Sequence, residues 1–331
     1  MDRIRRKQFP VLFHGSLYAD RLPIGKPEII EKSPHARLRD FYHDWYTPDR
    51  MAVVVVGDVD PARMESLIRA HFLSIPRPAN GRPAPVPDIP PHQETLFSIA
   101  TDKEATGSWV QVNYKRPRQP RITIGDLRRG LVENLLQTMV NERLSELTHQ
   151  AEAPFLYARS FSGQLGRRAE YAGFIAGVSD GGITKGLEAV LTEAARVQKY
   201  GFLASELERA KSELMAETER AYAERDKSES RIFAGQYVSY FLIGDPVPGI
   251  EATYRLTQAL LPGITLGEVT ELSTRLIHDD NRVILAAAPE KPGLAAPSEE
   301  GLRASLARIA KTPLTAWEDK SAGKTLMSKL P

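Results

Sequence analysis

The chain has 331 residues, of which 42% are hydrophobic and 26% charged, and it carries a formal net charge of +2. These values are typical of an ordinary soluble globular protein of about two domains. The net charge is too small to indicate that the protein binds nucleic acid. The sequence contains no cysteine, which excludes disulfides and thiolate metal sites, and no apolar run approaches the roughly 20 residues that span a membrane. We therefore expect neither nucleic acid nor a membrane among the partners.

The first 32 residues are expected to be irregular, because Pro10, Gly15, Pro23 and Pro27 interrupt them. The basic start of the chain is not followed by the apolar stretch of a signal peptide.

Residues 33–72 predict a helix, a buried strand and a second helix. The run from Met51 to Val56 (MAVVVV) is apolar and mostly β-branched, with turn signals at both ends, which is typical of a strand buried on both faces. Pro48 ends the preceding helix, and Pro61 occupies the first position of the following one. A lone strand leaves its backbone groups unpaired, so residues 1–73 are interpreted as the C-terminal remnant of a domain.

The rest of the chain divides into a linker, one complete domain and a tail. Seven prolines in residues 74–93 indicate an extended connector. Residues 94–289 predict strands at 109–114, 157–163, 171–178 and 282–288, and helices at 126–149, at 187–200, from 205 onward and at 266–278. This order predicts an α+β domain of antiparallel strands backed by helices. Residues 290–331 lack a core of their own and are expected to form an extended tail, with a short helix at 298–311 and a loose polar end.

The sequence contains no zinc-peptidase motif and no nucleotide-binding motif. The seven histidines include no pair four residues apart, so neither His-x-x-Glu-His nor His-Glu-x-x-His occurs. A phosphate loop and a dinucleotide fingerprint are also missing. The histidines are interpreted as structural, for example His149 near the C-terminal end of a helix, where a cation is favoured. We therefore assign no catalytic residue and no metal ligand to this chain.

Three sequence motifs are distinctive enough to be compared with known families: Tyr18 to Gly25 (YADRLPIG), Trp45 to Asp49 (WYTPD) and Met51 to Asp58 (MAVVVVGD). In this order they resemble the insulinase/pitrilysin family of zinc peptidases. The resemblance implies the insulinase-type αβ roll, with one partial and one complete domain in this chain. It also implies that the parent protein hydrolyses peptides inside a chamber of two halves, with zinc as its cofactor.

The resemblance further implies a first-half fragment without the catalytic part, because the match begins after the point where the zinc ligands would have passed. Residues 94–289 would then be a non-catalytic wall of the chamber, no zinc would be bound by this chain, and the chain alone would be inactive. The implied partners are the missing zinc domain and second half, and a peptide or protein substrate; the favoured compartment is the periplasm. The alternative is a non-catalytic partner subunit that binds an active peptidase or peptides.

One residue is a candidate for substrate binding. In its second half the family carries an Arg and a Tyr that contact the substrate near the zinc, after a helix equivalent to the one predicted at 126–149. Tyr157 falls at a similar place in this sequence, whereas Thr148 occupies the position of the Arg. Tyr157 is therefore the single candidate for substrate binding. The alternative is that Tyr157 is only a structural aromatic residue at the start of a strand.

Overall fold

The computed structural model describes residues 2–77 and 82–319. Its helices are α1 (Asp2–Leu12), α2 (Pro27–Lys32), α3 (His35–Trp45), α4 (Pro61–Phe72), α5 (Ile124–Thr148), α6 (Ile183–Tyr200), α7 (Ala204–Ala223), α8 (Ser230–Ile243), α9 (Ile250–Leu260), α10 (Leu266–Leu276) and α11 (Glu299–Ile309). Its strands are β1 (Leu96–Asp102), β2 (Ser108–Pro117), β3 (Tyr157–Leu165), β4 (Ala169–Val178) and β5 (Arg282–Pro289). Within those ranges, no helix is both long enough and apolar enough to cross a membrane.

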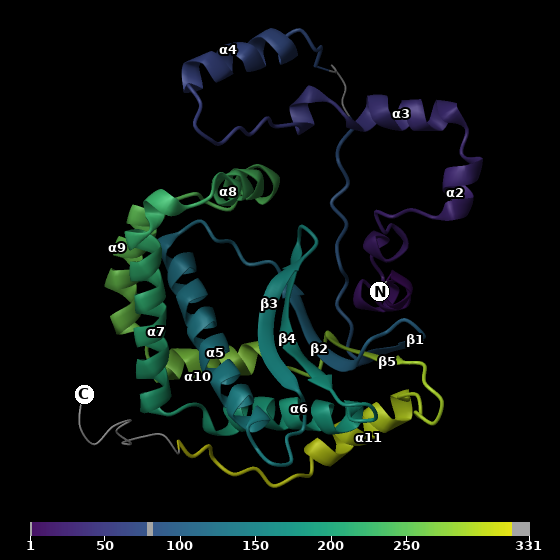
Figure 1. Cartoon of the computed structure of the whole chain (residues 1–331), viewed down its shortest axis with the longest axis vertical. Helices are drawn as coiled ribbons and strands as arrows, with labels where there is room; N and C mark the ends of the chain where they lie inside the picture. Colours follow the sequence, from purple (N-terminus) through teal and green to yellow (C-terminus); the bar gives the residue numbers. More distant parts are fainter. Residues whose placement is uncertain (1, 78–81, 320–331) are drawn as a thin grey trace.

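The strands form one five-stranded sheet in the order β1-β5-β2-β4-β3 (Figure 1). The pairs β2–β4, β3–β4 and β2–β5 are antiparallel, whereas β1 pairs with β5 in parallel. The predicted α+β class is confirmed. The parallel pair was not foreseen, since β1 itself was not predicted. It arises because β5 returns from the far end of the chain into the place between β1 and β2.

Alternation along the strands gives the sheet two different faces. Val110 and Val112 of β2, Phe174 and Ala176 of β4, and Ile284 of β5 are buried on one face, in the main core. Helices α5, α6, α7, α10 and α11 contribute side chains to the same core. On α5 these residues recur at helical spacing, which explains why the sequence predicted this helix well: Leu131, Leu135, Met139, Val140 and Leu144.

Two helix starts differ from the prediction by a few residues. Helix α5 begins after Thr123, whose hydroxyl accepts from the backbone N–H of Asp126, while the Asp126 carboxylate accepts from the Thr123 N–H. Helix α7 begins at Ala204 rather than after Ser205, and its capping carboxylate is Glu206, which accepts from the backbone N–H of Leu203 at 2.7 Å. Both arrangements satisfy backbone donors that a helix leaves free at its start.

The expectation that residues 1–32 are irregular is wrong for the first part of this segment. Helix α1 covers residues 2–12 and includes Pro10 in its last turn. Ile4, Gln8 and Leu12 recur every four residues, form one face and are buried. The Gln8 side chain donates to the backbone oxygen of Ala286 in β5 at 3.0 Å. Helix α1 therefore belongs to the packing of the sheet.

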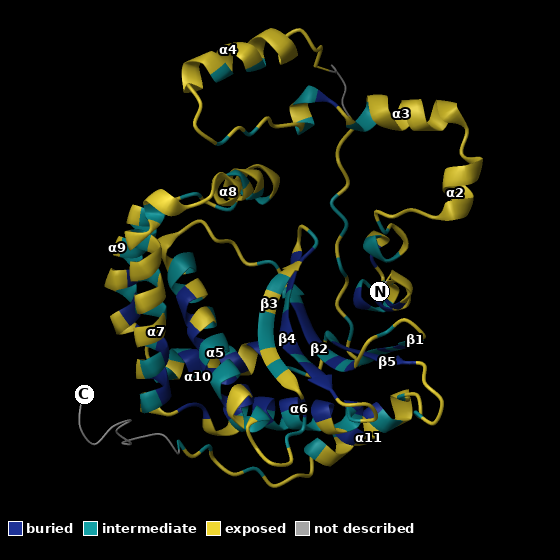
Figure 2. Ribbon diagram, viewed as in Figure 1, coloured by how far each residue is buried: buried dark blue, intermediate teal, exposed yellow. Residues whose placement is uncertain are grey.

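The predicted strand at Met51 to Val56 is also wrong. The backbone is extended at Met51, but no strand is formed, and Ala52 to Val56 make no backbone hydrogen bond within the described part of the chain. Met51, Val53 and Val55 are 56%, 49% and 43% exposed, and Figure 2 shows this segment and the neighbouring α3 and α4 mostly in the colour of exposed residues. The apolar pattern is present, but a strand forms only where a second strand supplies hydrogen-bond partners.

The tail after α11 is not loose up to residue 319. Helix α11 lies close to the predicted range, and residues 312–319 continue across α5, α6 and α7. The Tyr200 hydroxyl donates to the Leu314 oxygen at 2.6 Å, and Arg209 forms an ion pair with Asp319 at 2.6 Å. The prediction missed this docking because the segment is short and contains only one aromatic residue, Trp317. The last predicted loose residues, 320–331, lie outside the described residues.

Candidate functional site

The second face of the sheet is only partly covered. Over β1 and β5 it packs against α1, where Leu12 lies in a small core with Val283 and Leu285. Over β3 and β4 the same face stays accessible, and Figure 2 shows exposed and half-buried residues in alternation along β3. We call this accessible part the open face. It is defined by the outward residues Tyr157, Arg159, Phe161, Tyr171, Ile175 and Gln111, of which Tyr157 and Arg159 are exposed and the others half-buried.

Tyr157, the candidate from the sequence, is the first residue of β3 and lies on the open face. It pairs in register with Gly177 of β4. A Cβ atom added to Gly177 would lie 2.2 Å from Cε1 of Tyr157, so the ring packs directly over the glycine backbone. The residue remains 52% exposed. The glycine thus lets the ring lie flat on the sheet with one side open to solvent.

Thr148, which stands at the position of the family's Arg, is not part of this face. It is the last residue of α5, and its hydroxyl donates to the backbone oxygen of Ser145 in the same helix at 2.6 Å. The Tyr157 hydroxyl makes no hydrogen bond within the described part of the chain. The two residues therefore do not form a hydrogen-bonded pair.

Arg159 supplies a positive charge on the open face that the sequence analysis missed. It lies two residues after Tyr157 on the same strand and so on the same face, in register with Ile175 of β4, which in turn pairs with Gln111 of β2. Within the described ranges, no carboxylate lies at ion-pair distance from Arg159. The signal that could have found it is the period of two, counted from Tyr157 along the predicted strand.

Aromatic side chains extend the open face beyond Arg159. The rings of Phe161 in β3 and Tyr171 in β4 lie edge to face, with centroids 5.4 Å apart. At the other end Trp109 of β2 pairs with Gly177 on the strand next to Tyr157. The arrangement is a lone guanidinium flanked by aromatic rings on a pleated surface. It can hold an extended chain by stacking and apolar contact, and it can bind a carboxylate at Arg159.

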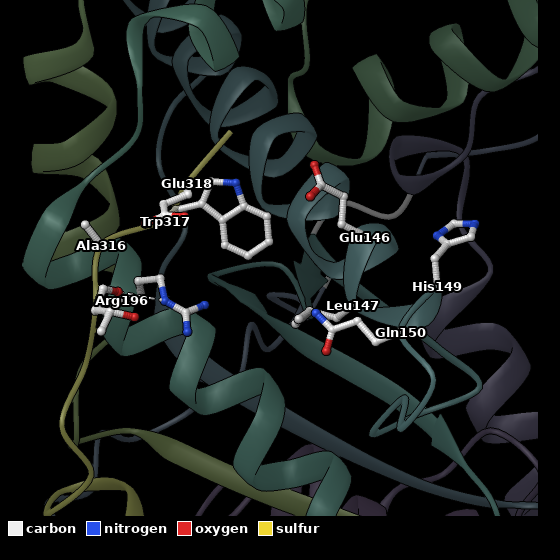
Figure 3. A pocket seen from close by; sticks show the side chains of 9 residues that line it. Glu146, Leu147, His149, Gln150, Arg196, Ala316, Trp317 and Glu318 are labelled. Atoms are coloured by element: carbon white, nitrogen blue, oxygen red, sulfur yellow. Dashed lines mark hydrogen bonds between the residues drawn. The ribbon is translucent and has the colours of Figure 1, made fainter. Parts of the chain in front are cut away.

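A separate cavity of about 630 Å³ lies between the end of α5 and the tail. Figure 3 shows Trp317 and Arg196 on one side of it and Glu146, His149 and Gln150 on the other. Arg196 donates to the Thr315 oxygen at 3.1 Å and also forms an ion pair with Glu193. His149 lies at the end of α5 as predicted, and its Nδ1 is 2.8 Å from the Ser145 oxygen. Arg196 thus binds the tail beside this cavity, and we do not assign a reaction to the cavity.

Comparison with known proteins agrees with this fold. The family described as the peptidase M16 inactive domain matches residues 34–214. The chain is 29% identical over 334 residues to the zinc protease PQQL-like of Arabidopsis thaliana, covering 99% of this chain and 32% of that protein. The solved periplasmic protease PqqL from Escherichia coli has a TM-score of 0.84 at 23% identity, covering 99% of this chain and 36% of that one. The solved first half of the same protease has a TM-score of 0.83 at 23% identity, covering 96% of this chain and 68% of that one.

The chain belongs to the M16 family of peptidases, which confirms the resemblance to the insulinase/pitrilysin zinc peptidases. It spans about a third of the length of the curated relatives it matches. Those relatives are named zinc proteases, but the described residues of this chain do not fit a zinc ion. They contain no group of three or more His, Asp or Glu side chains that could hold a metal, and the sequence has no His-x-x-Glu-His. No hydrolytic step through zinc follows from the residues of this chain.

Proposed function

We propose that this chain is the structural and peptide-contacting portion of a zinc peptidase of the M16 family, and that it is inactive without a zinc-bearing domain. In this proposal residues 1–73, apart from α1, complete that zinc domain, residues 74–93 connect the two parts, and residues 94–289 form a wall of the reaction chamber. Residues 290–331 lead towards the second half, after α11 and residues 312–319 have packed against that wall. The relatives that support the proposal are named zinc proteases. The second half of such a protease would be a further partner.

The observation that carries the proposal is the unpaired segment from Met51 to Val56. Its side chains are apolar, with Met51, Val53 and Val55 exposed, and the backbone groups of Ala52 to Val56 make no hydrogen bond within the described residues. A segment of this kind is stabilised when strands add to both of its edges. Helices α3 and α4 on either side expose Leu38, Phe41, Tyr42, Leu67 and Phe72, which would be covered in the same step. We infer that the partner is a sheet carrying the zinc ligands.

The open face supports the role of a chamber wall. Tyr157 and Arg159 lie side by side on an accessible strand surface, and the described residues place no acidic partner beside Arg159. We infer that the open face contacts an extended peptide substrate, with the Tyr157 ring stacked on it and Arg159 bound to an acidic side chain. This would give the parent enzyme a binding contact away from the bond that is cleaved.

The test of inactivity uses the purified chain, zinc chloride and a library of fluorogenic peptides. We expect no turnover with or without zinc. Zinc-dependent turnover that a chelator abolishes would overturn the proposal. A second test reads the DNA upstream of Met1: an in-frame His-x-x-Glu-His supports the proposal, whereas a stop codon beside a ribosome-binding site would favour the non-catalytic partner subunit instead.

We also propose a periplasmic location, because one solved protein with this fold is described as a periplasmic protease. Cell fractionation followed by immunoblotting tests it. Recovery of the protein with the periplasmic marker supports the proposal, and recovery only with a cytosolic marker contradicts it.

A further inference from the structure

The side chain of Lys115 is a buried cation without a counter-ion. It lies near the end of β2 and is 4% exposed. Its ammonium group donates to the backbone oxygen of Leu12, at the end of α1, at 3.3 Å. No carboxylate of the described residues lies within ion-pair distance of it. Buried lysines are rare unless they are paired, so an unpaired one indicates that an anion is missing.

Lys115 lines a cleft of about 330 Å³. One wall is the proline-rich segment from Asp88 to Pro91, and the other is the end of β2 from Lys115 to Pro117. Arg168 and Asn281 close the cleft. The space is small, and its lining includes Ile89 and three prolines. It therefore suits a compact ligand with a short apolar body.

The other cations around this cleft are already neutralised. Arg168 forms an ion pair with Asp88 at 3.1 Å. Arg116 forms ion pairs with Glu133 at 2.5 Å and with Glu170 at 2.7 Å. The uncompensated charge in the cleft is thus the single charge of Lys115, which indicates a ligand with one negative charge.

Asn281 gives the cleft a second donor and a fixed shape. Its φ of +53° places it in the left-handed region, where few residues other than glycine lie. Two hydrogen bonds of 2.8 Å join it to His92: the Asn281 backbone N–H donates to the His92 backbone oxygen, and the Asn281 side-chain oxygen accepts from the His92 backbone N–H. The Asn281 backbone oxygen also accepts from the backbone N–H of Lys115 at 3.1 Å. The side-chain nitrogen of Asn281 makes no hydrogen bond within the described part of the chain. It is a free donor on the rim of the cleft.

The protonation of Lys115 is consistent with a missing anion. Burial lowers the pKa of Lys115 from 10.5 to about 8, so the group is still mostly charged at neutral pH and its desolvation is not offset. Nearby, the buried Nε2 of His92 also lacks a hydrogen-bond partner. Burial lowers the pKa of His92, and the Lys115 charge adds to this effect.

We propose that the cleft between the proline-rich segment and the end of β2 binds a small monocarboxylate. The carboxylate oxygens accept from the Lys115 ammonium and the Asn281 amide, and the short apolar body packs against Ile89 and the prolines. A carboxylate fits better than a phosphate, because a dianion would need more donors and more charge than one lysine supplies. The site does not depend on any peptidase activity of the chain.

The test follows the side-chain signals of lysines by NMR while sodium propionate is added to the full chain at constant ionic strength. We expect a saturable shift of the Lys115 signal with a Kd on the order of 1 mM, and a rise in the Lys115 pKa of roughly one unit at saturation. Sodium chloride is the first control, and the signal of the exposed Lys185 is the second. An unsaturable shift, or an equal shift with chloride, would overturn the proposal.

Two further experiments test whether Lys115 binds the ligand and whether the ligand is a carboxylate. Lys115→Met removes the buried charge without opening a cavity, and we expect it to weaken propionate binding at least about tenfold, whereas Lys185→Met leaves it unchanged. Unchanged binding in Lys115→Met would overturn the assignment to Lys115. Inorganic phosphate is expected to bind more weakly than propionate, and tighter binding of phosphate would overturn the assignment to a carboxylate.

Discussion

The indole ring of Trp317 lies over the guanidinium of Arg143, with 5.1 Å between the ring centroid and the guanidinium carbon. Arg143 is 1% exposed and also lies 4.6 Å from the ring centroid of Phe202. It donates to Glu206 through two nitrogens, at 2.6 and 2.7 Å, and to Glu193 at 3.0 Å. The tail thus covers a buried charged group in the main core.

Truncation of Trp317 should destabilise the protein. We expect Trp317→Ala to lower the free energy of unfolding by about 1–3 kcal/mol, since it removes a cation–π contact and apolar burial at a half-buried site. Urea denaturation followed by circular dichroism measures it. Trp317→Phe keeps an aromatic ring over Arg143, so its free energy of unfolding should fall less than that of Trp317→Ala. If Trp317→Ala is as stable as the unmodified protein, Trp317 does not have this role.

Neutralising one carboxylate partner of Arg143 should lower the free energy of unfolding more than neutralising Arg143 and both of its carboxylate partners together. We expect Glu206→Gln to lower the free energy of unfolding by about 3–5 kcal/mol, because it leaves a buried guanidinium short of its carboxylate. The combined variant Arg143→Met, Glu193→Gln and Glu206→Gln should recover most of this loss. The exposed neighbour Glu208 provides the control, as Glu208→Gln should change stability by less than about 0.5 kcal/mol. A triple variant that is less stable than Glu206→Gln would refute the explanation.

The stability of the protein should rise between about pH 8 and pH 10.5 because of Lys115. The folded pKa of about 8 lies below the ordinary value of 10.5, so in this window the unfolded chain holds a proton that the folded protein has released. Raising the pH therefore favours the folded state. Urea midpoints at several pH values measure the slope. Other lysines and tyrosines titrate in the same range, so the prediction is that Lys115→Met reduces the slope and that Lys185→Met does not.

The segment from Met51 to Val56 should tolerate charge in this chain but not in the assembled peptidase. Val55→Lys places a charge at an exposed position, so we expect a change in unfolding free energy of less than about 0.5 kcal/mol. In the proposed assembly the same side chain is covered, so the variant should fail to associate with a co-expressed zinc domain. Val59→Lys, at another exposed valine outside the segment, is the matched control. Association of both variants to the same extent would argue against strand pairing here.

Arg159 should contribute to the binding of acidic peptides. We expect Arg159→Gln to weaken binding of such a peptide about fivefold, the effect of losing roughly 1 kcal/mol from an exposed ion pair. Fluorescence anisotropy with a labelled peptide measures it. Arg275→Gln on α10 removes an exposed arginine that already pairs with Glu271 and should have no effect. The contribution of Arg159 should also shrink at high salt, and a salt-independent loss would point to a structural role instead.

The elements with strong local patterns could be predicted from the sequence. The stripe of leucines in α5 and the alternation in β3 and β4, separated by a turn at Gly166, fix those elements without help from distant residues. Helix α1 could have been found from the four-residue spacing of Ile4, Gln8 and Leu12. Pro10 obscures this pattern, because a proline usually ends a helix.

The features that depend on distant partners could not be predicted in the same way. The Met51 to Val56 run has the composition of a buried strand, but its hydrogen bonds require strands that the described residues do not supply. Trp317 sits in a polar stretch, and only the fold brings it over Arg143. Tyr157 was identified as a candidate by resemblance, whereas Arg159 emerged once the register of β3 was known. Substrate contact by either residue stays a prediction.

The position of β5 has a consequence for how the protein is made. Among the described residues this strand is the last one in sequence, yet it lies between β1 and β2 in the sheet. While the ribosome synthesises the protein, β3 and β4 can form their hairpin early and β2 can pair with β4, but β1 finds no neighbouring strand until β5 has emerged. Contacts between residues so far apart in sequence form slowly, and the growing chain exposes an open β2 edge during that time. Translation that stalls before β5 should therefore yield a species prone to aggregation.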